Sequence, residues 1–382
     1  MTRWVLLETA PPGHRMRLPG HHLAEWLAAR GRKVAYVSVP VSPWHFLSRA
    51  ARPLARRRWS QEGSRGRWHG PNLFAYIPRT LLPVARGPLF DNEAAWRLSH
   101  RLTLPDAAGV LAAEGFSNPD VVCLQSPLLA PLAAALGARR LVVRIEDALD
   151  HFDGMPRVAL RHFPEALERA DLVTVTARSL ESWATGRGAR SVRNFPNGVA
   201  FARFRRPASL PPRPADLPPG PVAVYVGALD SWFDDGLLAA SLDASPSWRA
   251  VLIGPPGARL SRLREHPRVH FLGPKPQEQV PPYLWHADAG VIPFRRTPLI
   301  ESVSPLKLFE YLAAGLPVIA TRWRELEALQ APATLADGPA GWAKALADAE
   351  TPGAAARAAG IEWARVYDWE QLIADFAAAA ED

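Results

Sequence analysis

Cysteine is almost absent from this chain of 382 residues, and its scarcity excludes two ways of stabilising a fold. The single cysteine, Cys123, can form neither an internal disulfide nor a cysteine zinc cluster. It lies within an apolar strand pattern, so we expect a buried core residue.

Long apolar runs are also absent. No run reaches the roughly 18 residues that a membrane-spanning helix needs, and the longest, 128–138, contains Pro131 and Gly137. The chain enters a strand pattern at Trp4 without a preceding apolar signal segment. We therefore expect a cytoplasmic protein.

Charge of one sign is in mild excess, with 45 Lys and Arg against 37 Asp and Glu, a net charge of +8. A basic chain suits an anionic partner, which could be nucleic acid, a membrane surface or a phosphorylated small molecule. A general bias toward Arg, Ala and Pro explains part of this excess.

Strand and helix patterns alternate along the first half of the chain. The predicted strands are continuous apolar runs, as expected for a parallel sheet covered on both faces; they span 4–7, 33–39, 120–124, 141–145 and 172–175. A second α/β series has predicted strands at 222–226, 250–253, 269–272, 289–292 and 318–320.

Seven prolines between Pro207 and Pro221 separate the two series and predict a linker. We expect an N-terminal domain over 1–200, completed by a helix over 355–382, a linker over 201–221 and a C-terminal domain over 222–354. The predicted fold class is α/β with two doubly wound domains. Open α/β sheets bind ligands at the carboxyl ends of their strands.

The sharpest motif runs from Ser304 to Thr321. Ser304 and Pro305 can open a helix, and Lys307 and Glu310 then project on one face. A helix N-terminus with a lysine suits a diphosphate, and a glutamate can accept hydrogen bonds from ribose hydroxyls. On spacing alone, a surface Lys–Glu pair on an ordinary helix is the more frequent explanation.

The whole run nevertheless resembles the donor-site helix of GT-B glycosyltransferases of the family-4-like group, with the pattern P-x-K-x-x-E-Y-x-A-x-G-x-P-V. The resemblance implies two Rossmann-like domains facing across a cleft and a C-terminal helix crossing back to the N-domain. It also implies that Glu310 binds the ribose and Lys307 the diphosphate. One departure is Ser302, where many members carry a sugar-binding glutamate. This weakens the transfer of a retaining mechanism.

Further segments of the second half carry the same resemblance. The run Val224–Leu229 resembles the first strand and loop of the donor domain in teichuronic-acid-type glycosyltransferases, in which the glycine matching Gly227 lets backbone approach the phosphate and sugar. Residues 270–275 resemble the loop that holds the base. From these likenesses the donor-site residues are predicted to be Gly227, Leu272, Gly273, Lys275, Arg295, Ser302, Ser304, Lys307 and Glu310. Asp234 is expected to be only a helix cap.

A metal-chelating Asp-x-Asp triplet is missing. The resembled enzymes use lysine, arginine and helix dipoles at the diphosphate, so Arg295 or Arg296 is expected to join Lys307. We expect no metal and no cofactor.

In the first half, Glu146 and Asp147 follow a buried strand. This resembles the strand-end aspartate of the xanthan-type glucuronosyltransferase, and it predicts Asp147 as the catalytic base of an inverting transfer, although a plain turn cap explains it equally well. Glu146 should point to the other face. Gly13, His14 and Arg17 resemble the acceptor-side loop, for which an ordinary surface loop is an equal alternative.

Arginines crowd one short region together with two tryptophans. This composition favours an anionic membrane interface over a plain solvated surface, and nucleic acid is the least favoured partner. The region comprises Arg49, Arg52, Arg56, Arg57, Arg58, Arg65, Arg67, Trp59 and Trp68.

Together these features predict a metal-independent transferase. It would move a sugar from a nucleotide-diphosphate donor, with UDP favoured, to a hydroxyl of a glycan or lipid-linked acceptor in cell-surface polysaccharide or glycolipid synthesis. It would act in the cytoplasm or at the inner face of the membrane. Two alternatives stay open: an inactive GT-B module that binds a nucleotide sugar or a partner protein, and a non-hydrolysing UDP-sugar epimerase. Ser302 is the one feature that favours inactivity.

Overall fold

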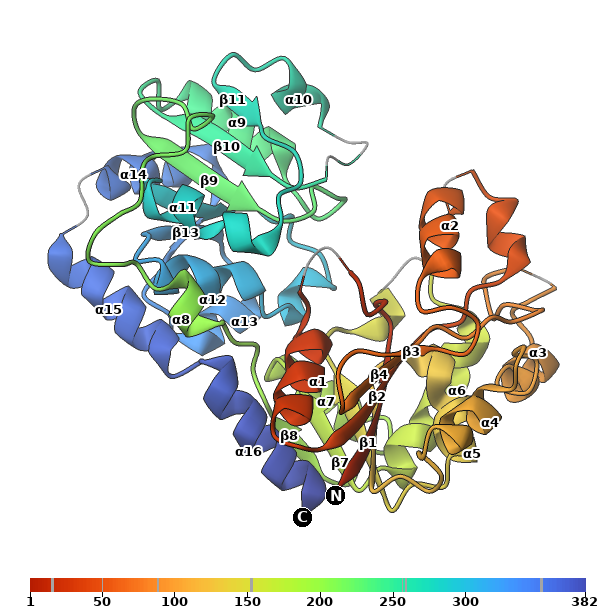
Figure 1. Ribbon diagram of the computed structural model, residues 1–382. Coiled ribbons are helices and arrows are strands. Elements are labelled where there is room, and N and C mark those ends of the chain that lie inside the picture. The colour runs from red at the N-terminus through yellow and green to blue at the C-terminus, as the bar shows by residue number, and fades with distance from the viewer. Residues whose placement is uncertain are drawn as a thin grey trace. The chain divides into compact units, whose positions relative to one another are not determined.

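The computed structural model describes residues 1–14, 17–49, 51–87, 89–151, 154–255, 257, 260–350 and 353–382 (Figure 1). The chain forms two compact units. Unit 1 contains 1–195 and 373–382, and unit 2 contains 196–372. Each unit holds a mainly parallel sheet flanked by helices, which confirms the predicted α/β class.

The unit boundaries differ from the predicted domain boundaries. Helix α8, Phe201–Phe204, occupies part of the predicted linker, because Phe201 and Phe204 are buried in the core of unit 2. The chain returns to unit 1 at Ile373 rather than at 355. The reason is that α15, Ala354–Arg365, packs along α12 of unit 2, where a Cβ atom on Gly360 would lie 3.2 Å from Leu312.

Among the described residues, the sheet of unit 1 has eight strands in the order β3-β4-β2-β1-β5-β6-β7-β8, in which β3 and β4 pair antiparallel and the other strands pair parallel. The strands are β1 Arg3–Glu8, β2 Lys33–Ser38, β3 Arg67–Trp68, β4 Leu73–Tyr76, β5 Val121–Leu124, β6 Arg140–Ile145, β7 Leu172–Val175 and β8 Val192–Asn194. The central strands are buried along their whole length, as the continuous apolar runs predicted.

Helices cover both faces of this sheet (Figure 1). The helices of unit 1 are α1 Pro19–Ala29, α2 Arg52–Ser60, α3 Glu93–Leu98, α4 Ala107–Ala113, α5 Ala130–Ala135, α6 Arg157–Arg169, α7 Ser179–Thr185 and, from Ile373 onward, α16 Trp369–Glu381. Of these, α2 and α3 pack on other helices and loops rather than on the sheet. Alternate residues of β1 face opposite layers: Val5 packs with the core beneath α4 to α7, whereas the Trp4 ring lies 6.4 Å from that of Phe376. The carboxylate of Glu381 also accepts a hydrogen bond from the Trp4 indole, at 3.0 Å.

The sheet of unit 2 has six parallel strands in the order β11-β10-β9-β12-β13-β14. They are β9 Val222–Val226, β10 Arg249–Ile253, β11 Val269–Phe271, β12 Ala289–Ile292, β13 Val318–Thr321 and β14 Thr334–Ala336. The remaining helices are α9 Asp235–Asp243, α10 Ser261–Arg264, α11 Pro281–Trp285, α12 Leu306–Ala313, α13 Arg324–Leu329 and α14 Gly338–Ala349.

Each sheet reverses its strand order beside its first strand, between β1 and β5 in unit 1 and between β9 and β12 in unit 2. In open parallel sheets the loops at such a switch point diverge and leave a crevice at the carboxyl ends of the strands. The two switch points therefore indicate where each unit would hold a ligand.

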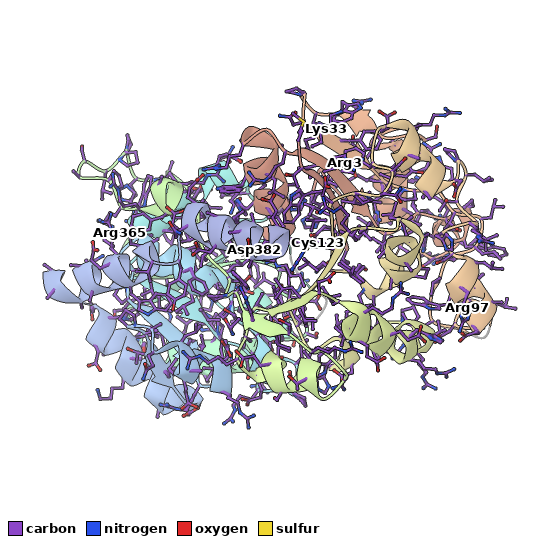
Figure 2. The ribbon with its side chains drawn as sticks, turned by 90° about the horizontal axis from the view of Figure 1, so that it is seen from below. Arg3, Lys33, Arg97, Cys123, Arg365 and Asp382 are labelled. Carbon is purple, nitrogen blue, oxygen red and sulfur yellow. The ribbon has the colours of Figure 1, made fainter. Side chains whose placement is uncertain are left out.

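Cys123 is fully buried on β5, as predicted, and lies among the strands in Figure 2, whereas Arg97 extends from the edge of that view. Across the described residues, no helix has both the length and the apolar character needed to cross a membrane.

Candidate functional site

Helix α12 starts at the switch point of unit 2, after the loop that follows β12. Its N-cap is Pro305 in an extended conformation, so the helix begins at Leu306 and the prediction that Ser304 caps it is wrong. Ser304 Oγ is instead buried without a hydrogen-bond partner among the described residues. The amide of Asn197 holds this start by donating to the Ser304 carbonyl oxygen, at 2.8 Å. The first N–H groups of the helix have no intrahelical acceptor and remain available to a ligand.

Lys307 lies over the carboxyl end of β9. Its Nζ is 5.1 Å from the ring centroid of Tyr225 and 4.7 Å from that of Phe294. Burial lowers the pKa of Lys307 to about 8, and the charge of Glu310 opposes this shift. Within the described residues Lys307 forms no ion pair, so it is a cation held in apolar surroundings without an anion. A bound phosphate would supply that anion.

Glu310 lies one turn further along α12. Gln277, just before α11, donates from Nε2 to Glu310 Oε1 at 3.3 Å. Burial raises the pKa of Glu310 to about 7, against the attraction of Lys307. The next residue, Tyr311, accepts a hydrogen bond from the backbone N–H of Val226 at 2.7 Å, which fixes α12 against the end of β9. Gln277 was not among the predicted site residues.

Three glycines line the carboxyl ends of β9, β10 and β11 beside Lys307. The N–H of Gly254 donates to the Gly273 carbonyl oxygen at 3.0 Å, and a Cβ atom on Gly254 would lie 1.9 Å from the Gly227 oxygen. A Cβ atom on Gly227 would lie 3.5 Å from Lys307 Cε. The backbone here is thus packed too closely for side chains at Gly254. The sequence analysis missed Gly254, although it follows its strand directly, as Gly227 does.

The structure brings Gly227, Gly273, Lys307 and Glu310 together but directs Lys275 elsewhere. Lys275 Nζ lies 2.9 Å from an Asp216 oxygen and 4.7 Å from the ring centroid of Tyr283. Leu272 continues the sheet through its N–H, which donates to the Leu252 oxygen at 3.0 Å.

Arg295 is already paired within unit 2. Its guanidinium lies 2.7 Å from Asp235 and 3.5 Å from Asp234. Asp234 caps α9 by accepting from the Leu237 N–H at 3.0 Å, as predicted. Arg295 would have to leave these carboxylates to reach a diphosphate. Ser302 donates to the Leu299 oxygen of its own turn at 3.0 Å.

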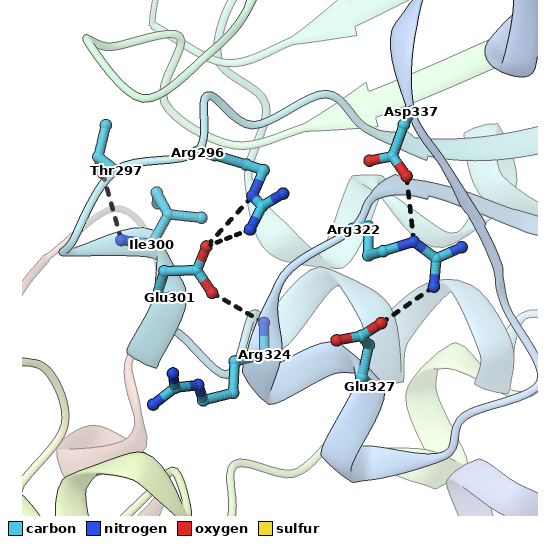
Figure 3. A network of polar contacts seen from close by, with 8 residues as sticks. All are labelled: Arg296, Thr297, Ile300, Glu301, Arg322, Arg324, Glu327 and Asp337. Atoms are coloured by element: carbon cyan, nitrogen blue, oxygen red, sulfur yellow. Dashed lines mark hydrogen bonds and ion pairs between the residues drawn. The ribbon is translucent and has the colours of Figure 1, made fainter.

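Glu301, the acid next to Ser302, also forms hydrogen bonds within unit 2 (Figure 3). One oxygen accepts from Arg296 at 3.1 and 3.2 Å, and the other accepts from the backbone N–H of Arg324 at 3.0 Å, at the start of α13. In the same view Arg322 bridges Glu327 and Asp337. Glu301 therefore cannot replace the missing glutamate without giving up these contacts.

In unit 1, Asp147 follows β6, one strand from the switch point. It is half-buried and forms no hydrogen bond or ion pair with the rest of the described chain. Burial, and secondly the charge of Glu146, raise the pKa of Asp147 to about 7. Glu146 has different surroundings, since Arg144 lies 3.1 Å from one oxygen and Gln125 donates to the other at 3.3 Å. A carboxyl group of pKa near neutrality is suited to accept a proton.

Sequence reasoning missed Glu8, the last residue of β1. Its carboxyl group is buried, one oxygen has no partner among the described residues, and a Cβ atom on Gly20 of α1 would lie 2.4 Å from its Cδ. Burial and the charge of Glu146 raise its pKa to about 8, against the opposing effect of Arg144. A single acid at the end of an apolar run is the signal that could have identified it.

We expect Glu8 to make unit 1 less stable as the pH rises. Its folded pKa of about 8 exceeds its ordinary value of 4.5, so folding favours the protonated form and the stabilisation is lost as the pH rises through 8. Glu8→Gln should therefore unfold at a temperature higher than the wild type by about 2 °C or more at pH 9, and by less at pH 5. Thermal scans across pH test this, with Glu181→Gln as an exposed control. An unchanged pH dependence in Glu8→Gln would contradict it.

The predicted acceptor-side residues lie in the loop after β1. Arg57 of α2 donates to the Gly13 oxygen, and Arg17 pairs with Glu25. The ring of His14 lies 6.5 Å from that of His21.

The two tryptophans of the arginine- and tryptophan-rich region are half-buried. The Trp59 ring packs 5.6 Å from that of Phe46, and the Trp68 indole donates to Glu114 at 2.7 Å. Arg58 is drawn inward toward the Val39 oxygen, and burial lowers its pKa to about 10. The membrane contact predicted for this region stays a prediction.

Among the described residues, no group of three or more His, Cys, Asp or Glu side chains could hold a metal ion. The expected absence of a metal and of a cofactor stays a prediction.

One protein family and several solved structures are similar to this chain. Residues 220–359, which contain Gly227, Gln277, Lys307 and Glu310, match the family model of glycosyl transferases group 1. The solved structures that resemble the chain are GT-B glycosyltransferases, and the predicted GT-B fold is confirmed.

The chain is 28% identical over 174 residues to TuaH of Bacillus subtilis (strain 168), named as a glycosyltransferase of teichuronic acid biosynthesis. That match spans 44% of this chain and 44% of TuaH, so the chain matches less than half the length of this relative. The predicted likeness to teichuronic-acid-type enzymes is confirmed, whereas that to the xanthan-type enzyme stays a prediction.

Two solved structures are similar along nearly the whole chain. Sucrose-phosphate synthase from Thermosynechococcus elongatus has a TM-score of 0.71 and 19% identity, covering 99% of this chain and 98% of that one. HepE of Anabaena in complex with UDP and glucose has a TM-score of 0.67 and 16% identity, covering 99% of both chains. At these identities the likeness shows the fold alone.

Proposed function

We propose that this chain is a glycosyltransferase that takes its sugar from a nucleotide-diphosphate donor bound in unit 2. The observation that carries the proposal is Lys307, an unpaired cation over the end of β9, beside close-packed glycine backbone and the free N-terminus of α12. Phosphate groups suit this combination of cation and backbone N–H groups. Glu310 then lies one turn away, at a distance suited to ribose hydroxyls.

UDP is the favoured nucleotide. Its support is the resemblance to HepE, whose structure holds UDP and glucose. We propose that Asp147 is the base that takes the proton from the acceptor hydroxyl. Its support is a half-buried carboxyl group with a pKa near 7 at a strand end.

The acceptor is proposed to be a hydroxyl of a glycan or a lipid-linked sugar in cell-surface polysaccharide synthesis, a class suggested by the name of TuaH. We further propose that the reaction needs no metal, that no nucleic acid takes part, and that the protein works in the cytoplasm at the membrane surface. Lys307 and the α12 N-terminus would then neutralise the leaving diphosphate in place of a metal ion.

Donor binding and donor turnover test the proposal separately. We expect UDP at about 100 times its Kd to stabilise unit 2 by about 2.7 kcal/mol, visible as a rise in melting temperature, with GDP giving a smaller rise. Slow release of UDP from a UDP-sugar, with water as the acceptor, would establish an active enzyme. A chain that no nucleoside diphosphate stabilises would contradict the proposal.

A second candidate is a GT-B module that binds a nucleotide sugar without transferring it. The observation in its favour is Ser302, whose hydroxyl is used within its own turn where a sugar-binding carboxylate would stand. Stabilisation by UDP together with no UDP release from any UDP-sugar and acceptor mixture would favour this module over the enzyme.

A further inference from the structure

A hollow of about 460 Å³ in unit 1 lies at the start of α6, at the end of the segment that follows β6 and carries Asp147. Three arginines and one aspartate contribute to its lining, which comprises Arg86, Gly87, Asp91, Arg157, Val158 and Arg161. Arg157 and Arg161 are four residues apart on α6 and therefore share one face of the helix.

No described side chain outside the hollow pairs with Arg157 or Arg161. Arg157 and Arg161 are exposed, and neither side chain forms a hydrogen bond or ion pair with another residue in the part of the chain that is described. Arg86 uses Nε to donate to the Met155 oxygen at 3.2 Å. Asp91 is committed to the α6 N-terminus, where it accepts from the N–H groups of Arg157 and Val158 at 2.9 and 2.8 Å.

With three cations and one anion, the lining has an excess of two positive charges. Arginine presents its donors as a planar fork that matches the oxygens of a phosphate group. Because the aspartate is already held by two backbone donors, an incoming phosphate would meet the guanidinium groups.

Exposed apolar side chains lie close in sequence to residues of the hollow. Of the eleven large apolar side chains that are exposed among the described residues, eight lie between Trp44 and Leu104, all in unit 1. We call six of them the leucine rim: Trp44, Leu81, Leu82, Leu89, Leu98 and Leu104. Leu89, which is 73% exposed, stands two residues before Asp91 of the hollow.

Contacts between separate segments hold the leucine rim together. The Trp44 indole donates to the Leu81 oxygen at 3.0 Å, and its ring lies 5.4 Å from that of Phe90. The N–H of Leu81 donates to the Leu102 oxygen at 3.1 Å, which brings the chain near Leu104 alongside. Apolar side chains gathered in this way on a surface, next to cations, are typical of a contact with a membrane.

We propose that the arginine hollow binds the phosphate of an anionic membrane lipid while the leucine rim inserts among the acyl chains. The proposal rests on the proposed function only in taking the membrane as the place of the acceptor. It assigns the apolar part of the contact to the leucine rim, since the half-buried Trp59 packs against Phe46 and the half-buried Trp68 donates to Glu114.

Sedimentation with vesicles tests the proposal on the full chain. We expect the protein to bind vesicles of phosphatidylcholine containing phosphatidate and not vesicles of phosphatidylcholine alone. Arg157→Ser/Arg161→Ser should weaken this binding about 25-fold, since each cation near an anionic surface contributes about fivefold. The control Arg190→Ser/Arg205→Ser removes two exposed arginines outside the hollow and should change binding by no more than about twofold.

The apolar part has its own matched pair of variants. Leu89→Ser should weaken vesicle binding about tenfold, whereas Val366→Ser, at an exposed site of unit 2, should leave it unchanged. An equal loss of vesicle binding in the hollow variant and in the control variant would overturn the proposal, because binding would then depend on net charge alone. Binding of inorganic phosphate in the hollow by a protein that binds no vesicles would also overturn the proposal. The ligand would then be a free phosphate.

Stabilisation by UDP, measured on the same samples, separates this proposal from the proposed function. Vesicle binding that persists in a chain that UDP does not stabilise would keep the lipid site and reject the donor site. A chain that UDP stabilises but that does not bind phosphatidate vesicles would keep the donor site and reject the lipid site.

Discussion

Replacing Asp147 by asparagine should reduce turnover by about 10²–10⁴-fold while leaving UDP affinity near that of the wild type. An amide of the same shape cannot take the proton from the acceptor hydroxyl. The donor-site residues lie in unit 2 and are unchanged by the substitution. Single-turnover rates at saturating donor, together with a UDP titration, separate the two effects.

The pH dependence gives this prediction a second readout. Only the ionised carboxylate can act as a base, and the pKa of Asp147 is about 7, so wild-type turnover should fall as the pH drops below 7. Glu146→Gln is the matched control, because Glu146 is held by Arg144 and Gln125 rather than open to an acceptor. Removing its charge should lower the pKa of Asp147 and shift the profile to lower pH, with a milder loss of rate.

Two results would reject Asp147 as the base. One is near-wild-type turnover of Asp147→Asn. The other is a product with the anomeric configuration of the donor, determined by NMR, because a base-assisted direct displacement inverts that centre. Neither result would touch the donor site in unit 2.

The features that the sequence predicted well are those that depend on local pattern. Central strands such as Val121–Leu124 are continuous apolar runs, and α12 carries a helical apolar face ended by Gly315, so both could be located without tertiary information. The apolar run of β4 was overlooked. The two-residue edge strand β3 and the arginine-rich helix α2 have no such pattern, and they were missed too. Their formation depends on neighbouring elements.

The predictions for the donor site divide in the same way, into those that follow from local spacing and those that depend on residues distant in sequence. Lys307 and Glu310 share a helix face, so their proximity followed from spacing. The partners of Arg295 and Lys275 come from residues 60 and 59 positions away, and no local rule indicates them. Ser304 failed as a cap because Pro305 takes the extended conformation itself. Glu8 became notable only once β1 stood beside the strands that bring Arg144 and Glu146 near it.

Replacing Glu310 by alanine should weaken UDP binding by about 1.5–3 kcal/mol, the range for hydrogen bonds to a charged group. The loss corresponds to roughly 10- to 150-fold in Kd. The carboxylate is held beside Gln277 one turn from Lys307, where it can accept from both ribose hydroxyls while the diphosphate lies at the helix N-terminus.

Inorganic pyrophosphate distinguishes the two residues, since it has no ribose. Glu310→Ala should bind pyrophosphate about as well as the wild type, whereas Lys307→Ala should lose affinity for both pyrophosphate and UDP. Loss of pyrophosphate binding in Glu310→Ala would mean that the substitution disturbs α12 rather than a ribose contact. Gln277→Ala, which removes only the neighbour of the carboxylate, should have a smaller effect on UDP.

The pKa values add a test that a merely structural role would not pass. Glu310 must be ionised to accept from the ribose, and its pKa is about 7, whereas Lys307 must be protonated to attract the diphosphate, and its pKa is about 8. The affinity of the wild type for UDP should therefore be greatest between pH 7 and 8 and decline on both sides. In Glu310→Ala the decline on the acid side should disappear while the decline above pH 8 persists. Unchanged UDP affinity in this variant would remove the central support for the donor site.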